Sequence, residues 1–435
     1  MKLPVENYEF PSDWKVSPVS EVADFSRGVS WGKAEEAPEG KGLLVISIPN
    51  IKDGWIDYYS KFNHYLSTEV AASKRLNVGD IVFVGSSGSI HNVGRNARVS
   101  SLPNGSVAFA SFTFKAAPKT TAIDGEFFYY LVNSDLVPFP SFCKRAADGK
   151  FNFQLRDFAN RLAIPLPPLP EQKKIAHILT TVQRAIEAQE RIIQTTTELK
   201  KALMHKLFTE GLPRRSSSKG GPPVHEPQKQ TEIGPVPESW ELVRIKAAGT
   251  VVTGSTPSTK NPEFYGDGYN LISPADLDNG KYVRSAHKTL TKAGFEKCRA
   301  IPRDSVLVGC IGNVGKLGMV GDDCSATNQQ INAVITNSQF NPHFIYYALQ
   351  FCRPRLEQAA AKVTVPILNK SNFENFQIPT PLRAVQDEIA GFLGVLDQKL
   401  ENAGQKKAQL QDLFRTLLHE LMTAKTRVHE LELSA

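Results

Sequence analysis

The stretch Ile164-Pro165-Leu166-Pro167-Pro168-Leu169-Pro170-Glu171-Gln172-Lys173-Lys174-Ile175-Ala176 has a diverged second copy in this chain. The second copy starts 214 positions later as Ile378-Pro379-Thr380-Pro381 and keeps Gln386, Ile389 and Ala390 in register. The same shift also pairs Leu179 with Leu393, Leu199 with Leu413, Leu203 with Leu417, His205 with His419 and Thr209 with Thr423. A gap-free match over about 45 residues predicts an internally duplicated chain.

The regions in front of these stretches match more loosely. Residues 79–88 resemble residues 303–312 at a shift of 224, and residues 128–131 resemble residues 345–348 at a shift of 217. Trp14 and Trp240 each stand near the start of a half. Divergent front parts on similar rear parts indicate two different recognition surfaces on one common frame.

The front parts predict mixed α/β domains. Short β-rich runs such as 80–84 and 106–114 are separated by Gly, Asn and Pro, as is typical of strands and turns. The segments 127–132 and 342–349 predict short helices.

The rear parts predict long helices. Pro170-Glu171-Gln172 is a typical helix start, and a helix of some 40 residues spans about 60 Å. Both copies show a heptad pattern whose a and d positions are mostly apolar and are interrupted by a few polar residues, as in a coiled-coil seam with irregularities that set the register. In the first copy the a positions are Ile175, Val182, Gln189, Thr196 and Leu203, and the d positions are Leu179, Ile186, Ile193, Lys200 and Leu207. In the second copy they are Ile389, Leu396, Ala403, Leu410 and Leu417, and Leu393, Leu400, Lys407, Phe414 and Leu421.

Two arrangements of these helices are open from the pattern: each packs on its own domain, or the two pack on each other. The length without proline favours the second. We therefore predict an α+β protein, in which two pseudo-repeated mixed α/β domains are separated by two long helices that form an antiparallel coiled coil. The expected segments are a first domain at 1–165, a first helix at 166–211, a linker at 212–236, a second domain at 237–378 and a second helix at 379–431.

The linker is rich in Pro, Gly and Ser and cannot bury a core. Its basic residues either contact phosphate or belong to a solvated connector, which is the favoured interpretation. The 435-residue chain has a net charge of +7, which favours an anionic partner such as nucleic acid.

The five scattered cysteines predict neither a disulfide framework nor a zinc cluster. Met1–Lys15 lacks the apolar core of a signal peptide, and no run of 18 apolar residues predicts a membrane span. We expect a reduced, cytoplasmic protein.

The sequence lacks complete motifs for ATP hydrolysis, adenine methylation and metal catalysis. Gly315-Lys316 is followed by Leu317, so it is not a nucleotide-binding P-loop. Asn261-Pro262-Glu263-Phe264 and Asn341-Pro342-His343-Phe344 lack the second proline of the adenine-methyltransferase motif Asn/Asp-Pro-Pro-Tyr/Phe. The histidines show no metal-ligand spacing. We expect no catalytic site, cofactor or metal in this chain.

The repeated helix entry with Pro170-Glu171-Gln172, together with Thr253-Gly254-Ser255-Thr256-Pro257-Ser258, resembles the specificity subunits of type I restriction-modification systems. The second entry departs from the family pattern because it keeps only the glutamine, Gln386. Gly391, Gly394 and Gly404 also lower the helix propensity there.

The resemblance implies that each front part is a target-recognition domain that reads one half of a bipartite double-stranded DNA site. It implies that the paired helices act as a spacer and dock two modification (methyltransferase) subunits, which restriction (translocase and nuclease) subunits join. S-adenosylmethionine, ATP and Mg²⁺ are then expected in the partner subunits: the modification subunits flip the target adenine for methylation, and the restriction subunits add ATP-driven cleavage.

Candidate DNA-contacting residues are taken from polar, glycine-rich loops, because Asn, Gln, Arg and Ser read base edges and Lys and Arg bind phosphate. In the first domain they are Arg27, Ser86, Ser87, Ser89, His91, Asn92 and Arg95, with Lys144 and Arg145 on phosphate. In the second they are Thr253, Ser255, Thr256, Asn313, Lys316, Asn328, Gln329 and Gln330. For each of them a solvated turn residue is the alternative. Two rival functions also stay open: a self-contained restriction enzyme and a coiled-coil scaffold without a nucleic-acid role.

Overall fold

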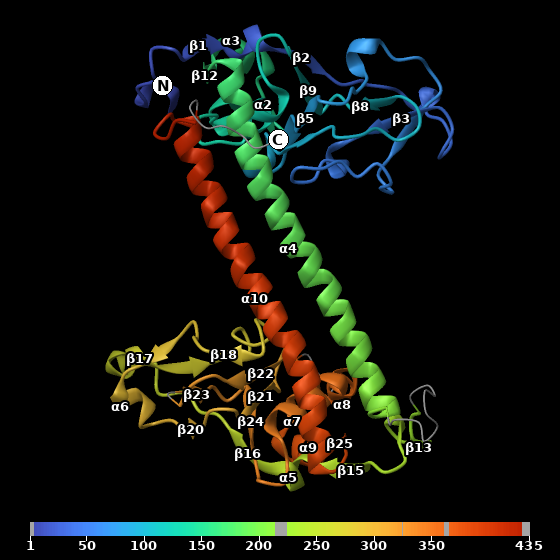
Figure 1. Ribbon diagram of the computed structural model, residues 1–435, viewed down its shortest axis with the longest axis vertical. Coiled ribbons are helices and arrows are strands. Elements are labelled where there is room, and N and C mark those ends of the chain that lie inside the picture. The colour runs from blue at the N-terminus through green and yellow to red at the C-terminus, as the bar shows by residue number, and fades with distance from the viewer. Residues whose placement is uncertain (1–3, 214–223, 324, 361–364, 429–435) are drawn as a thin grey trace, which may run out of the picture. The chain divides into compact units, whose positions relative to one another are not determined.

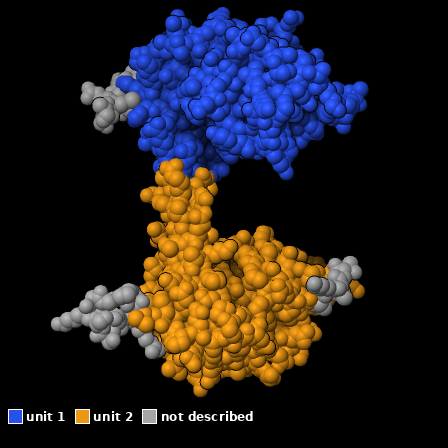
Figure 2. All heavy atoms as spheres, turned by 90° about the vertical axis from the view of Figure 1, so that its right-hand side faces the viewer, with its two compact units in different colours: residues 1–187, 408–435 blue, residues 188–407 orange. Residues whose placement is uncertain are grey.

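The computed structural model describes residues 4–213, 224–323, 325–360 and 365–428. The middle of the predicted linker (214–223), Cys324 and the last residues of the predicted second helix (429–431) lie outside the described residues. The chain divides into two compact units, residues 1–187 with 408–435 and residues 188–407 (Figure 2).

The first unit is built on a four-stranded antiparallel sheet, ordered β2-β9-β5-β7, and a three-stranded sheet, ordered β4-β3-β8. Two smaller sheets, β10-β11-β6 and β1-β12, complete it. The strands are β1 (Lys15–Pro18), β2 (Ala23–Arg27), β3 (Leu43–Ile46), β4 (His64–Leu66), β5 (Ile81–Val84), β6 (Ser86–Ser87), β7 (Asn96–Arg98), β8 (Val107–Phe109), β9 (Thr113–Pro118), β10 (Cys143–Arg145), β11 (Phe151–Phe153) and β12 (Ala163–Leu166). The short helices are α1 (Val19–Val22), α2 (Gly125–Val132) and α3 (Leu155–Arg161).

The second unit repeats this plan with sheets β16-β24-β21-β22-β18, β19-β17-β23-β20, β15-β25 and β13-β14. Its strands are β13 (Gln228–Thr231), β14 (Gly234–Pro237), β15 (Glu241–Arg244), β16 (Gly249–Thr253), β17 (Tyr265–Ile272), β18 (Tyr282–Val283), β19 (Thr289–Leu290), β20 (Ala300–Ile301), β21 (Val306–Gly309), β22 (Leu317–Val320), β23 (Ser325–Thr327), β24 (Ile331–Thr336) and β25 (Gln377–Thr380). Its short helices are α5 (Ile245–Ala248), α6 (Lys292–Phe295), α7 (Pro342–Phe351), α8 (Arg353–Ala359) and α9 (Lys370–Asn375).

The duplication predicted from the repeat is therefore present in the fold. The order β2-β9-β5-β7 corresponds to β16-β24-β21-β22, and the parallel pair β3-β8 corresponds to the parallel pair β17-β23. Helices α2 and α7 lie where the sequence predicts short helices, and each begins at a capping residue, Asp124 or Asn341. Each unit has its own core, with Phe83, Phe114 and Phe158 in the first and Trp240 and Phe344 in the second.

The two long helices, α4 (Leu169–Glu210) and α10 (Arg383–Met422), pack together as an antiparallel pair (Figure 1). Every a and d side chain of the two heptad patterns is buried or half-buried, so the predicted seam is the contact surface. Its two lysines each meet a carboxylate of the other helix: Lys200 lies 2.6 Å from Asp397, and Lys407 lies 2.9 Å from Glu190. Residue numbers rise along one helix as they fall along the other, which is the antiparallel order.

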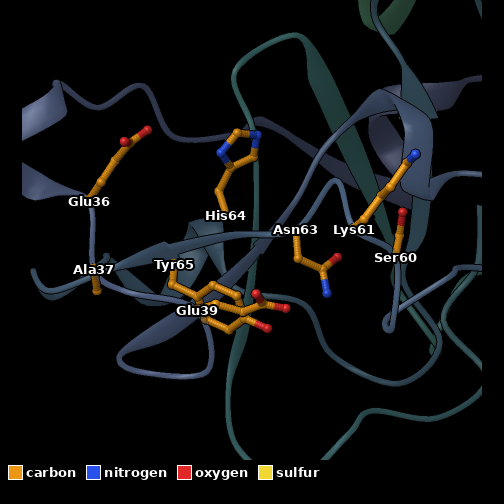
Figure 3. Close-up of a pocket in the computed structure, with 8 residues that line it drawn as sticks. All are labelled: Glu36, Ala37, Glu39, Ser60, Lys61, Asn63, His64 and Tyr65. Carbon is orange, nitrogen blue, oxygen red and sulfur yellow. The ribbon is translucent and has the colours of Figure 1, made fainter.

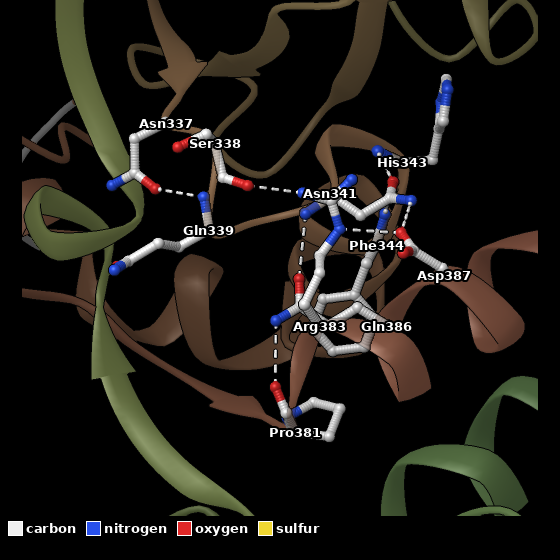
Figure 4. A network of polar contacts seen from close by, with 10 residues as sticks. All are labelled: Asn337, Ser338, Gln339, Asn341, His343, Phe344, Pro381, Arg383, Gln386 and Asp387. Atoms are coloured by element: carbon white, nitrogen blue, oxygen red, sulfur yellow. Dashed lines mark hydrogen bonds and ion pairs between the residues drawn. The ribbon is translucent and has the colours of Figure 1, made fainter.

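The glutamine kept in both helix entries makes the same two hydrogen bonds in each copy. Gln172 donates to the Pro167 carbonyl (2.8 Å) and accepts from the backbone N–H of Asp124 (2.8 Å). Gln386 donates to the Pro381 carbonyl (2.9 Å) and accepts from the N–H of Asn341 (2.9 Å; Figure 4). Each glutamine thus joins the start of a long helix to the capping residue of α2 or α7, which explains why the second entry keeps this residue alone.

The first unit adds an ionic cluster at its helix entry. The guanidinium of Arg427, beyond the end of α10, bonds both oxygens of Glu171 (2.8 Å each) and lies within 3.2 Å of both oxygens of Asp13. Trp14 also donates to Glu171, at 3.1 Å. Burial raises the pKa of the Glu171 carboxyl, but the hydrogen bonds from Arg427 and Trp14 outweigh it and lower that pKa below its usual range. The second copy has Val385 in place of this glutamate.

Candidate nucleic-acid interface

In the first unit, several predicted DNA-contacting residues meet on the small sheet β10-β11-β6. Strand β11 lies in the middle, and its Asn152 faces Ser86 on one side and Lys144 on the other. Phe151 lies between Ser87 and Arg145 in the same way, and the Arg145 guanidinium lies 5.9 Å from the centre of its ring. The serines from one loop and the cations from another, 58 positions apart in sequence, are thus brought together by strand pairing.

Arg27 joins this sheet from β2, because its Nη2 donates to the Phe153 carbonyl at 2.8 Å. A surface hollow of about 520 Å³ lies beside it. Its lining residues are Phe25, Arg27, Lys144, Gln154, Leu155, Arg156, Asp157 and Ala159. Three cations and one carboxylate around this hollow give a surface suited to phosphate.

The remaining predicted residues of the first unit differ in how accessible they are. Ser89, His91 and Asn92 are exposed on or beside the short helix η5 (Ile90–Asn92), which follows β6. Ser86 is buried, and Arg95 is half-buried, with its Nη2 3.4 Å from the Ile48 carbonyl. The exposed three are placed to meet a ligand, whereas Ser86 and Arg95 face the protein.

In the second unit, two predicted segments lie against each other. The hydroxyl of Thr256 donates to Gln329 (2.8 Å), and the N–H of Ser255 donates to the Thr327 carbonyl (2.9 Å). Asn328 donates to Gln330 (3.0 Å), so the amides are ordered by hydrogen bonds within their own turn. The Gln330 carbonyl accepts from Cys310, which places the loop with Asn313 next to this turn.

Two predicted residues of the second unit have structural partners. Thr253 donates to Asn332 (2.7 Å), and Lys316 donates to the Pro274 carbonyl (3.2 Å) and is half-buried. Asn313 and Gln329 are exposed, whereas Asn328 and Gln330 are half-buried. Burial raises the pKa of the neighbouring Cys310 to about 11, so this residue is a neutral thiol at physiological pH.

A turn that contacts a glycine occurs at the same place in both units, and only its second copy holds candidates chosen from the sequence. A Cβ atom on Gly28 would lie 2.1 Å from the Phe109 carbonyl oxygen, and one on Gly254 would lie 2.2 Å from that of Thr327. Each glycine therefore allows a strand end to touch the turn after β8 or β23. The turn is Asn328–Gln330 in the second unit and Ala110–Phe112 in the first. The only signal in the sequence was a glycine after each of two distant strands, which does not identify the turn it contacts.

Another hollow in the first unit, of about 200 Å³, has a different character (Figure 3). It is lined by Glu36, Ala37, Glu39, Ser60, Lys61, Asn63, His64 and Tyr65. None of these is a predicted DNA-contacting residue, and the two glutamates disfavour a phosphate there. Within the described part of the chain, no group of three or more His, Cys, Asp or Glu side chains is arranged to hold a metal ion, and no helix is long and apolar enough to span a membrane.

Comparison with known proteins identifies this fold. The model of the type I restriction modification DNA specificity domain matches residues 11–197 and again residues 237–412. A putative type I restriction enzyme MjaX specificity subunit from Methanocaldococcus jannaschii is 24% identical over 427 residues, which cover 97% of this chain and 95% of that protein. The HindI specificity subunit from Haemophilus influenzae is 24% identical over 355 residues, 68% of this chain and 77% of that protein.

Solved structures agree on the fold. The S subunit of the type I restriction-modification system from M. genitalium superimposes with a TM-score of 0.60 at 15% identity, covering 97% of this chain and 98% of the other. A chain from a study of complex assembly and conformational transition in a type I system gives 0.51 at 16% identity, covering 95% and 99%. With both of its halves matched by the family's domain model, this chain belongs to the DNA specificity subunits of type I restriction-modification systems.

Proposed function

We propose that each unit reads one half of a bipartite double-stranded DNA site through the turns around Gly28 and Gly254. The observation that carries this proposal is that the same turn, packed against a glycine, occurs in both units with different side chains on it. The first copy carries Phe112, with Arg27 next to Gly28, and the second copy carries the amides of residues 328–330. Because groove readout depends on donors, acceptors and apolar groups at base edges, two different sets of side chains read two different words.

The long helices are proposed as the spacer and as the docking surface for two modification (methyltransferase) subunits, which restriction subunits join. Support comes from apolar side chains on the helices that face away from the seam. Leu199 and Leu413, which the repeat pairs, are 56% and 46% exposed, and Phe392 and Val395 of α10 are 54% and 69% exposed. One exposed leucine at the same repeat position on each helix suits a pair of like partners.

The chemistry is proposed to reside in those partners, which would supply the sites for S-adenosylmethionine, ATP and Mg²⁺. This chain then acts as a non-catalytic DNA reader in the cytoplasm. Purified alone with labelled S-adenosylmethionine and unmethylated DNA, it should transfer no methyl group. With modification subunits from its host added, methylation should appear at one bipartite sequence.

A domain exchange tests whether each unit reads its own half of the DNA site. Replacement of residues 14–160 by the same region of a relative should change one half of the methylated site and leave the other half intact. The matched exchange of residues 237–378 should change only the other half. Alteration of both halves by one exchange, or methyl transfer by the chain alone, would overturn the proposal.

A further inference from the structure

The turn Ala110–Phe112 of the first unit presents an aromatic ring to solvent from a rigid backbone. The Phe112 side chain is 60% exposed. Its carbonyl accepts from the N–H of Gly85 (2.8 Å), the N–H of Ser111 donates to Val29 (2.7 Å), and the Thr113 hydroxyl donates to Ala110 (2.7 Å). The backbone is held by hydrogen bonds on both sides of Phe112, so the point from which the exposed ring projects is fixed.

The place of this ring in the fold distinguishes it from other exposed apolar residues. The turn follows the parallel pair β3-β8, as the amide-bearing turn follows the parallel pair β17-β23. Phe112 thus occupies the position that Gln330 occupies in the second unit, three residues after the last residue of the preceding strand. One unit carries an aromatic group where the other carries an amide.

Hydrogen bonds connect the turn to a cation-bearing part of the first unit. Gly85, which bonds Phe112, also accepts from the N–H of Phe153 (2.9 Å), and the Phe153 carbonyl accepts from Arg27. The exposed Lys144 and Arg145 lie on the strand that pairs with β11. Two backbone hydrogen bonds thus lead from Phe112 through Gly85 to Phe153, whose carbonyl binds Arg27. Cations that bind phosphate on this part of the unit would hold a duplex near the ring.

Base edges offer only one apolar group to such a ring, the C5-methyl of thymine in the major groove. Asn and Gln, by contrast, match the donor and acceptor of adenine. We propose that Phe112 is a base-reading residue of the first unit that contacts a thymine C5-methyl group. This inference rests on the proposed function and names one specificity contact within it.

The test uses the full chain assembled with its modification subunits and duplexes that carry the methylated site. Each thymine of the half-site read by the first unit is replaced in turn by deoxyuridine, which lacks only the methyl group. At one position we expect the wild-type complex to bind roughly three- to fivefold more weakly, as for the loss of one buried methyl group. Phe112→Ala should show this weaker binding already with thymine and no further loss with deoxyuridine.

Two variants serve as controls. Phe112→Leu keeps an apolar contact and should retain part of the discrimination between thymine and deoxyuridine. Val78→Ala removes an apolar side chain that is 62% exposed near the opposite end of β5, and it should bind every duplex as the wild type does.

Each other outcome has a definite meaning. Equal effects of Phe112→Ala on all duplexes, no effect at all, or loss of the modification subunits from the complex would each overturn the assignment of Phe112. Tight binding by the wild-type complex with no thymine-dependent position would overturn it as well, while leaving the proposed function intact. Absence of any sequence preference in the wild-type complex would instead refute the proposed function.

Discussion

The amine of Lys200 on α4 lies 2.6 Å from the Oδ1 atom of Asp397 on α10, and both side chains are less than one-sixth exposed. Asp397 also accepts a hydrogen bond from the Tyr347 hydroxyl, which in turn accepts one from Lys281 at 3.0 Å. Asp397 thus pairs with Lys200 directly and is linked to Lys281 through the Tyr347 hydroxyl. These contacts join both long helices to α7 within the second unit. The corresponding place in the first unit is less ionic: Tyr130 contacts Phe414 and the Thr180 hydroxyl.

Asp397→Asn should destabilise the second unit strongly, because it leaves the poorly solvated Lys200 without its carboxylate and removes a nearby negative charge from Lys281. Loss of one partner of a buried pair costs about 3–5 kcal/mol, and the modest exposure here places the expected loss near about 3 kcal/mol. Hydrogen exchange of the α7 amides should measure it. Glu401→Gln, which breaks the more exposed pair with Arg284, should cost below about 1 kcal/mol. Equal losses of stability in the two variants would show that Asp397 stabilises the unit no more than the exposed pair of Glu401 and Arg284 does.

Lys281 should make the stability of the second unit rise with pH. Burial lowers the pKa of its amine to about 8 from 10.5. Between these values the unfolded chain binds more protons than the folded chain, so unfolding becomes less favourable as pH rises. The expected gain from pH 7 to pH 9 is roughly 1 kcal/mol. Lys281→Met should abolish that increment in denaturant titrations, whereas Lys260→Met, at an exposed lysine of the same unit, should keep it. A decrease with pH in both proteins would contradict this assignment.

Arg427→Met should weaken the first unit at neutral pH, because Glu171 is then buried without its cation. The expected loss is about 2–3 kcal/mol, below that of a fully buried pair because Arg427 is 23% exposed. The lowered pKa of Glu171 means that the stability it contributes is present above its unfolded pKa and is lost as pH falls through its folded pKa. The difference between wild type and variant should therefore shrink on acidification towards pH 4. A stability difference between wild type and Arg427→Met that stays constant from neutral pH to pH 4 would exclude the Glu171 carboxylate as its source.

Gln172→Ala and Gln386→Ala should have parallel effects, each confined to its own unit. Each variant leaves one backbone N–H and one proline carbonyl without a partner, at an expected cost of roughly 2–3 kcal/mol. Amide hydrogen exchange at the start of α2 should become faster in Gln172→Ala. Amide hydrogen exchange at the start of α7 should become faster in Gln386→Ala. Gln398→Ala removes an exposed glutamine of α10 that donates to Asn402 one turn along the same helix (2.9 Å), and this variant should change stability by less than about 0.5 kcal/mol. If Gln172→Ala and Gln386→Ala each affected both units equally, the local role assigned to these glutamines would be wrong.

Insertion of four residues after Thr197 tests the helices as a spacer. Four residues keep the helix roughly in phase and lengthen it by about 6 Å. Since successive base pairs are about 3.4 Å apart, both half-sites should be retained while the unread gap grows by one or two base pairs. Methylation mapping of the variant complex measures the gap. Full activity with an unchanged gap would show that the helices do not set the spacing.

The sequence by itself determined the architecture. The 214-residue repeat identified a duplicated chain, and the heptads identified the faces by which α4 and α10 meet, because a seam must bury an apolar stripe at a regular period. The lysines at heptad positions and the lone glutamine of the second entry stood out as irregularities. Their partners, Asp397, Glu190 and the capping residue Asn341, lie in other elements, and periodicity within one helix carries no information about them.

Only the tertiary structure decided which residues share a surface. Strand pairing placed Ser86 and Lys144 on either side of Asn152, and a glycine contact brought Thr256 to Gln329. The tertiary structure also decided that Asn92 is exposed and Ser86 is buried. It places Phe112 in an exposed position on a turn that no pattern in the sequence distinguishes. Hydrophobic periodicity is a local property of the chain, whereas the make-up of a binding surface depends on contacts between segments far apart in sequence, and a chain read in order does not contain those contacts explicitly.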